Sequence, residues 1–178
     1  MESGEDRSPR ALRVHLQIQY TPLMRILAFS IAVLLASAAG AKPWNGIEPG
    51  VSHRDDVTKK FGEPSKTVVV ESKEILAYVG PRAIKGTTEA QFKVDNASKL
   101  VERIDVFPGP MVDREAVEST YGPPCAPGSP PASACYVKKL TDEFQTYFLY
   151  AKLGLAVFWN EDGKSVKSFV FQQPKASK

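Results

Sequence analysis

The chain has 178 residues, with 23 basic and 20 acidic side chains and a formal net charge of +3. This excess is small, and its two basic doublets, Lys59-Lys60 and Lys138-Lys139, stand far apart. A nucleic-acid-binding surface needs denser positive charge, so the composition argues against one, and both doublets are expected on solvated faces.

The N-terminal region predicts export. The stretch MRILAFSIAVLLASAAGA (24–41) has one basic residue, an apolar core and small residues at its end. Ala39-Gly40-Ala41 fits the small-x-small pattern for signal peptidase, which would make Lys42 the first mature residue. Residues 1–23 lie ahead of Met24, where a secretory signal would normally begin, so Met24 is a candidate start.

The alternative for this region is a retained membrane anchor. The apolar core of about a dozen residues is too short to cross roughly 30 Å of hydrocarbon, which favours the cleaved signal. We therefore expect residues 1–41 to be a signal peptide region. The mature protein is expected to be periplasmic or secreted, without a stable membrane anchor.

Both cysteines, Cys125 and Cys135, lie in the part that would be exported, on either side of APGSPPASA. A short-spaced pair in an oxidising compartment predicts a disulfide, and two free thiols are the alternative. A metal site would need more ligands than the sequence offers. In the chain-entropy picture this bridge would stabilise the fold by about 2–3 kcal/mol.

A short helix is expected after Ser52. Ser52 and Asp55 can form a capping box, and Val57 and Phe61 stand one turn apart on one face. Gly62 is expected to end the helix. Such a short helix is unstable alone, so its apolar pair must pack on another element.

A second copy of this pattern follows. Asp113 is the expected N-cap, Val117 and Tyr121 repeat the apolar pair, and Gly122 repeats the stop. Each apolar residue and each glycine stands sixty positions after its counterpart. This agreement predicts an internal repeat.

Strand-like segments follow each helix. Four are expected in the first copy (67–70, 74–79, 87–94, 100–107) and four in the second (135–140, 146–150, 155–159, 165–171). The predicted fold is α+β, with two tandem repeats, each a short helical segment packed on a four-stranded antiparallel meander. The repeats would span 42–108 and 109–178 and form one body.

The segment GIEPGVSHRDDVTKKFGEP resembles the SmpA/OmlA family, to which the outer-membrane assembly factor BamE belongs. The residues that carry this resemblance are Ile47, Gly50, Val51, Ser52, Val57, Phe61, Gly62 and Pro64. The tandem arrangement is similar to that of the β-lactamase inhibitor proteins. The resemblance implies helix-on-sheet repeats that act by binding other proteins.

The sequence offers little for catalysis. His53 lies beside the first expected helix start, Asp55-Asp56 belongs to its first turn, and Glu161-Asp162 reads as a hairpin turn. Phosphate-loop, zinc and calcium motifs are absent from the sequence. We therefore expect no enzyme activity, no cofactor and no metal. An enzyme would require His53 to meet an acid or thiol from the other repeat.

Aromatic residues of the second repeat are the candidate binding surface. Neighbours such as Tyr147 and Phe148 must point to opposite faces of a strand. One interpretation is that both faces are core. The other is an open partner-binding face, for which we select Tyr136, Tyr147 and Trp159.

The function predicted from the sequence is a non-catalytic, exported protein-binding module of the bacterial cell envelope, accessory to outer-membrane assembly or maintenance. The alternative is a secreted enzyme inhibitor. The partner would be an envelope protein or a secreted enzyme, and no nucleic acid is expected to bind.

Overall fold

The structure, a computed structural model, describes residues 41–130 and 134–174. The first helix, α2 (Arg54–Phe61), is followed by β1 (Lys66–Val70), β2 (Lys73–Val79), β3 (Thr87–Asp95) and β4 (Val101–Pro108). The second helix, α3 (Arg114–Tyr121), is followed by β5 (Val137–Leu140), β6 (Thr146–Tyr150), β7 (Leu155–Trp159) and β8 (Val166–Gln172). Short 3₁₀ turns, Gly80–Arg82 and Ala151–Leu153, follow β2 and β6. The predicted strands and helices are all present, within two residues of their expected bounds.

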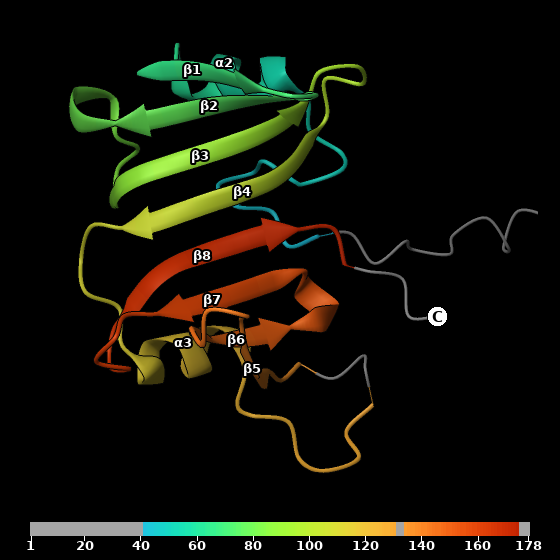
Figure 1. Ribbon diagram of the computed structural model, residues 1–178, viewed down its shortest axis with the longest axis vertical. Helices are drawn as coiled ribbons and strands as arrows, with labels where there is room; N and C mark the ends of the chain where they lie inside the picture. The colour runs from blue at the N-terminus through green and yellow to red at the C-terminus, as the bar shows by residue number, and fades with distance from the viewer. Residues whose placement is uncertain (1–40, 131–133, 175–178) are drawn as a thin grey trace, which may run out of the picture. The chain divides into compact units, whose positions relative to one another are not determined.

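The eight strands form one antiparallel sheet in the order β1-β2-β3-β4-β8-β7-β6-β5 (Figure 1). The two meanders are joined by pairing of β4 with β8, where Asp105 lies opposite Val170. The α+β prediction is confirmed. The sequence did not indicate that both meanders would share a single sheet.

The helix starts follow from local hydrogen bonds. Asp113 caps α3 as expected, because its Oδ1 accepts from the backbone N–H of Ala116 at 2.8 Å. The prediction for α2 is wrong by one residue: His53 is the N-cap, and the Asp56 carboxylate accepts its N–H at 2.8 Å. The hydroxyl of Ser52 is used elsewhere, since it accepts from the N–H of Glu48 at 2.9 Å.

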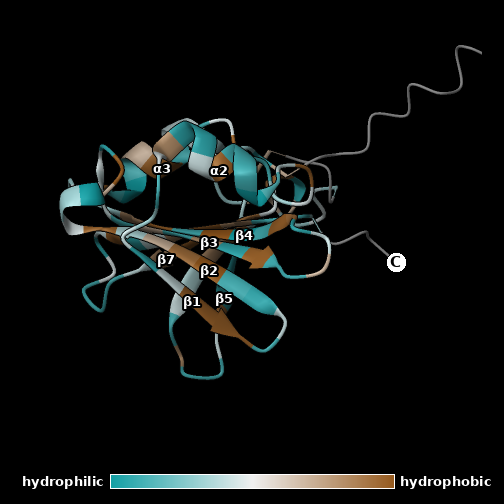
Figure 2. Ribbon diagram, turned by 90° about the horizontal axis from the view of Figure 1, so that it is seen from above, coloured by the Kyte–Doolittle hydropathy of each residue, from teal (hydrophilic) through white to brown (hydrophobic). Residues whose placement is uncertain are grey.

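Both helices cover the same face of the sheet (Figure 2). Val57 of α2 and Val117 of α3 are fully buried against it. Complete burial of each apolar side chain contributes about 1.5–3 kcal/mol, which holds helices too short to persist alone. The large side chains buried beneath them are Leu76, Tyr78, Phe92, Ile104, Phe148, Tyr150, Leu155 and Phe171.

A buried tyrosine secures the end of each helix. The hydroxyl of Tyr78 donates to the carbonyl of Gly62 at 2.8 Å, and that of Tyr150 donates to the carbonyl of Gly122 at 3.0 Å. Burial raises the pKa of both phenols, so each stays a neutral donor. Gly62 and Gly122 have φ of 77° and 113°, where a side chain would be strained.

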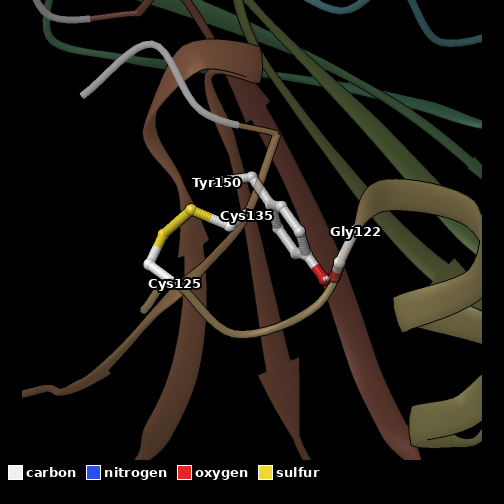
Figure 3. Close-up of a disulfide and its surroundings, with 4 residues drawn as sticks. All are labelled: Gly122, Cys125, Cys135 and Tyr150. Carbon is white, nitrogen blue, oxygen red and sulfur yellow. Dashed lines mark hydrogen bonds between the residues drawn. A yellow bond between two sulfur atoms is a disulfide. The ribbon is translucent and has the colours of Figure 1, made fainter. Parts of the chain in front are cut away.

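The expected disulfide between Cys125 and Cys135 is present. It closes the loop between α3 and β5 beside the contact of Tyr150 with Gly122 (Figure 3). Among the described helices, none is long and apolar enough to cross a membrane. The predicted signal peptide lies outside the described residues, apart from Ala41.

Candidate functional site

The other face of the sheet carries a groove over β6, β7 and β8. Side chains alternate along each strand, so the neighbours of the residues beneath the helices point to this other face, where Ala156 and Val170 are 6% and 5% exposed. Leu149, Ala156 and Val170 lie side by side across three strands. The groove has a volume of about 480 Å³, and its lining includes these three residues with Arg103, Tyr147, Phe158 and Gln172.

A stacked aromatic pair forms one side of the groove. Tyr147 and Phe158 are cross-strand neighbours whose ring centroids lie 5.0 Å apart, with planes inclined by 19°. Both rings are half-buried. Such a pair presents a rigid, amphipathic surface at a small entropy cost, which suits a protein contact.

The groove is polar where it meets the first half of the sheet. The carboxylate of Asp105 is buried and accepts from Arg103 Nε at 2.7 Å, while Lys93 Nζ lies 3.0 Å from its second oxygen. The remaining guanidinium N–H groups of Arg103 have no hydrogen-bond partner among the described residues. They are available to an acceptor on a bound molecule.

The disulfide loop borders the groove. A smaller pocket of about 290 Å³ lies between Cys125–Pro130 and the strands, and Leu149 and Ala151 line both spaces. The disulfide therefore fixes the loop at one end of the groove, beside its apolar floor.

The structure separates the three aromatic residues selected from the sequence. Tyr147 is in the groove, but Tyr136 and Trp159 are on the helix-covered face, where they are 7% and 3% exposed. The prediction that Tyr136 and Trp159 form an open binding face is therefore wrong. Both pack on Phe148, at centroid distances of 3.9 Å for Tyr136 and 4.8 Å for Trp159.

Tyr136 also makes a polar contact within the core. Its hydroxyl donates to Glu118 Oε1 at 2.8 Å. Burial, and then the neighbouring Glu118 carboxylate, raise the pKa of this phenol to about 12. This residue, just before β5, contacts α3 rather than facing a partner.

Phe158 is the groove residue that the sequence interpretation missed. In LAVFW, the residues Leu155, Val157 and Trp159 alternate with Ala156 and Phe158. This parity separates Phe158 from Trp159, but only the register of β6 on β7 brings Phe158 beside Tyr147. The alternation was readable, but a five-residue apolar strand does not by itself say which face is covered.

The other polar candidates remain separate. His53 is exposed at the start of α2, and Asp162 accepts the backbone N–H of Lys164 at 2.9 Å in the turn after β7. Neither residue has a free thiol beside it, because both cysteines form the disulfide. Within 41–130 and 134–174, no cluster of three or more His, Cys, Asp or Glu side chains is arranged to hold a metal.

No protein-family model matches this chain, and no curated protein sequence matches it significantly. The fold is similar to that of the DUF4309 family protein YjgB from Bacillus subtilis subsp. subtilis str. 168. The two are 16% identical, with a TM-score of 0.50 over 77% of this chain and 90% of YjgB. At this identity the similarity shows the fold alone.

A weaker similarity is to the cysteine-rich secretory protein SAV1118 from Staphylococcus aureus subsp. aureus Mu50. The two are 10% identical, with a TM-score of 0.38 over 68% of this chain and 43% of SAV1118. At that score no conclusion about this chain follows.

Proposed function

We propose that this protein is an exported, non-catalytic binding module whose partner is another protein of the bacterial cell envelope. The groove carries the proposal, because it combines an aromatic pair, an apolar floor and a partly unpaired guanidinium on an uncovered sheet face. Tyr and Arg are enriched at the centres of protein interfaces, where they dominate affinity. Export is supported by the N-terminal pattern and by the disulfide.

The groove chemistry defines the part of the partner that would dock. A large apolar side chain would pack between Tyr147 and Leu149, above Ala156. An acidic group beside it would meet the free N–H groups of Arg103. The partner would therefore present an apolar residue flanked by a carboxylate. A role in outer-membrane assembly or maintenance is our first candidate, and inhibition of a secreted enzyme is the second.

We also propose that the chain arose by tandem duplication, with repeats at 42–108 and 109–178. Support comes from the shared order of one helix and four strands, and from the matching Tyr78–Gly62 and Tyr150–Gly122 hydrogen bonds. A BamE-like ancestry for the repeat is part of this proposal and rests on the motif of residues 47–64.

The test is partner capture followed by measurement with the purified partner. A Tyr147→Ala/Phe158→Ala variant should bind roughly 100-fold more weakly, because each ring would be a central contact. A Val69→Ala/Val70→Ala variant is the matched control, since it removes exposed apolar groups from the far edge of the sheet. Thermal unfolding should establish that both variants fold. Equal affinity of the groove variant and the wild type would rule out the groove as the binding site.

A further inference from the structure

A second pocket lies where α3 begins, between the β5–β6 and β7–β8 turns. Its volume is about 510 Å³, and it shares no lining residue with the groove. Three cations line it, Arg114, Lys138 and Lys167, together with the carboxylates Glu143 and Glu161. None of these five charged groups forms an ion pair with another described residue. The pocket thus holds an excess of unpaired positive charge.

Arg114 occupies a position that the fold alone does not favour. It is the first residue of α3, where the helix dipole disfavours a cation. Its guanidinium lies over two aromatic rings, 5.3 Å from the centroid of Phe148 and 5.7 Å from that of Trp159. The rings hold a planar fork of donors whose geometry matches a carboxylate.

Trp159 supplies a buried donor that lacks an acceptor. It lines the pocket and is 3% exposed, and its Nε1–H has no hydrogen-bond partner within the described part of the chain. By contrast, the buried hydroxyls of Tyr78, Tyr136 and Tyr150 all donate to oxygen atoms. A buried N–H without an acceptor is unusual and calls for an explanation.

The rim adds an apolar contact. Phe144, in the β5–β6 turn, is 83% exposed and has a φ of 59°, a strained conformation for an aromatic residue. Strain of this kind concentrates at binding sites. Phe144 lies beside the cations, so one ligand could use both.

We propose that this pocket binds a peptide carboxylate that has an apolar side chain next to it. Arg114 pairs with the carboxylate, and Lys138 and Lys167 add to the positive field. Nε1 is itself covered, so neighbouring side chains shift on binding, and one carboxylate oxygen then accepts the indole N–H. Phe144 contacts the apolar side chain. This site is independent of the groove and its proposed partner.

The indole N–H resonance of Trp159 in the ¹⁵N-labelled protein tests the proposal directly. The probes are N-acetylphenylalanine, N-acetylphenylalanine amide, N-acetyl-aspartyl-phenylalanine amide and sodium sulfate, at matched ionic strength. A carboxylate probe should shift this resonance downfield with saturation, whereas the uncharged amide should not. Response to the first or the third probe identifies a chain terminus or an acidic side chain as the source of the carboxylate.

Charge variants complete the test. Arg114→Gln should weaken binding by about tenfold or more, and Lys138→Gln, at an exposed strand position, should weaken it less. Lys85→Gln is the matched control, because Lys85 is an exposed cation remote from the pocket in the chain. An unshifted Trp159 resonance with every probe, an equal response to sulfate, or unchanged binding by Arg114→Gln would each overturn the proposal.

Discussion

The first half of the structure, from α2 to β4, is charged and paired, whereas the uncovered face of the second half is apolar and grooved. Every ion pair among the described residues lies in the first half, between residues 54 and 105. The second half has instead the stacked Tyr147 and Phe158, the groove and the disulfide. The same elements thus support two different surfaces.

This difference shows which properties the scaffold requires and which it leaves free. Both halves keep the buried valine of the helix, the glycine stop and the tyrosine hydroxyl that binds it. The features that differ lie on the uncovered face, at the starts of the two helices or in the loop before β5. Side chains there do not determine the packing of helix on sheet, so they can vary with a binding role.

The two glycine stops provide the largest expected effect. Alanine at Gly62 meets no neighbouring atom, so only its positive φ should matter, at about 1–2 kcal/mol. A Cβ at Gly122 would also collide with the carbonyl oxygen of Ala134, so Gly122→Ala should cost at least about 3 kcal/mol. Urea unfolding of the two variants measures the difference. Equal losses of unfolding free energy in the two variants would mean that the Ala134 carbonyl moves aside at little cost.

The disulfide is the next point of difference, because the first half has no counterpart. Cys125→Ala/Cys135→Ala should lose about 2–3 kcal/mol through the freed loop. Chemical reduction should lower the free energy of unfolding of the wild type by a similar amount, seen as a lower urea midpoint. It should leave the urea midpoint of the double variant unchanged. A midpoint insensitive to both treatments would show that contacts alone hold the loop against the strands.

The tyrosine–glycine contacts test whether the covered faces are equivalent. Tyr78→Phe and Tyr150→Phe each remove one hydroxyl and leave a helix-end carbonyl without its donor, so each should cost about 0.5–1.5 kcal/mol. The two values should agree, although the halves differ on the other face. A several-fold difference between them would argue against equivalent packing of the two helices.

The helices and strands were the predictable part of this molecule. Val57, Phe61 and Gly62, with Val117, Tyr121 and Gly122, carry local signals for short helices, and turn residues bound each strand. The groove was not predictable in the same way. Tyr147 and Phe158 meet only through the register of β6 on β7, and Arg103 joins them only because β4 pairs with β8. Long-range pairing of this kind leaves no local pattern.

The smallest predicted effect concerns acid, at the turns that follow β3 and β7. Asp95 accepts the Ser98 N–H at 2.8 Å, the Lys73 ammonium at 3.0 Å and the Ser98 hydroxyl at 3.0 Å. These contacts, the Ser98 N–H first, hold the pKa of Asp95 well below its usual range. In the second half the corresponding residue is Asn160, whose amide donates to Ser165 Oγ at 2.9 Å.

Because folding lowers the pKa of Asp95, its contribution to stability is present above the unfolded value of about 3.9 and is lost as the pH falls below it. Asp95→Asn, which makes this turn resemble that of the second half, should therefore be less stable than the wild type near neutral pH. The difference in thermal midpoint between the wild type and Asp95→Asn should narrow as the pH drops from about 5 toward 2. A gap that stays constant with pH would mean that the geometry of the turn matters rather than its charge. Asn160→Asp is the reciprocal variant: it should gain no comparable acid dependence, since no lysine or arginine is paired at that turn within the described residues.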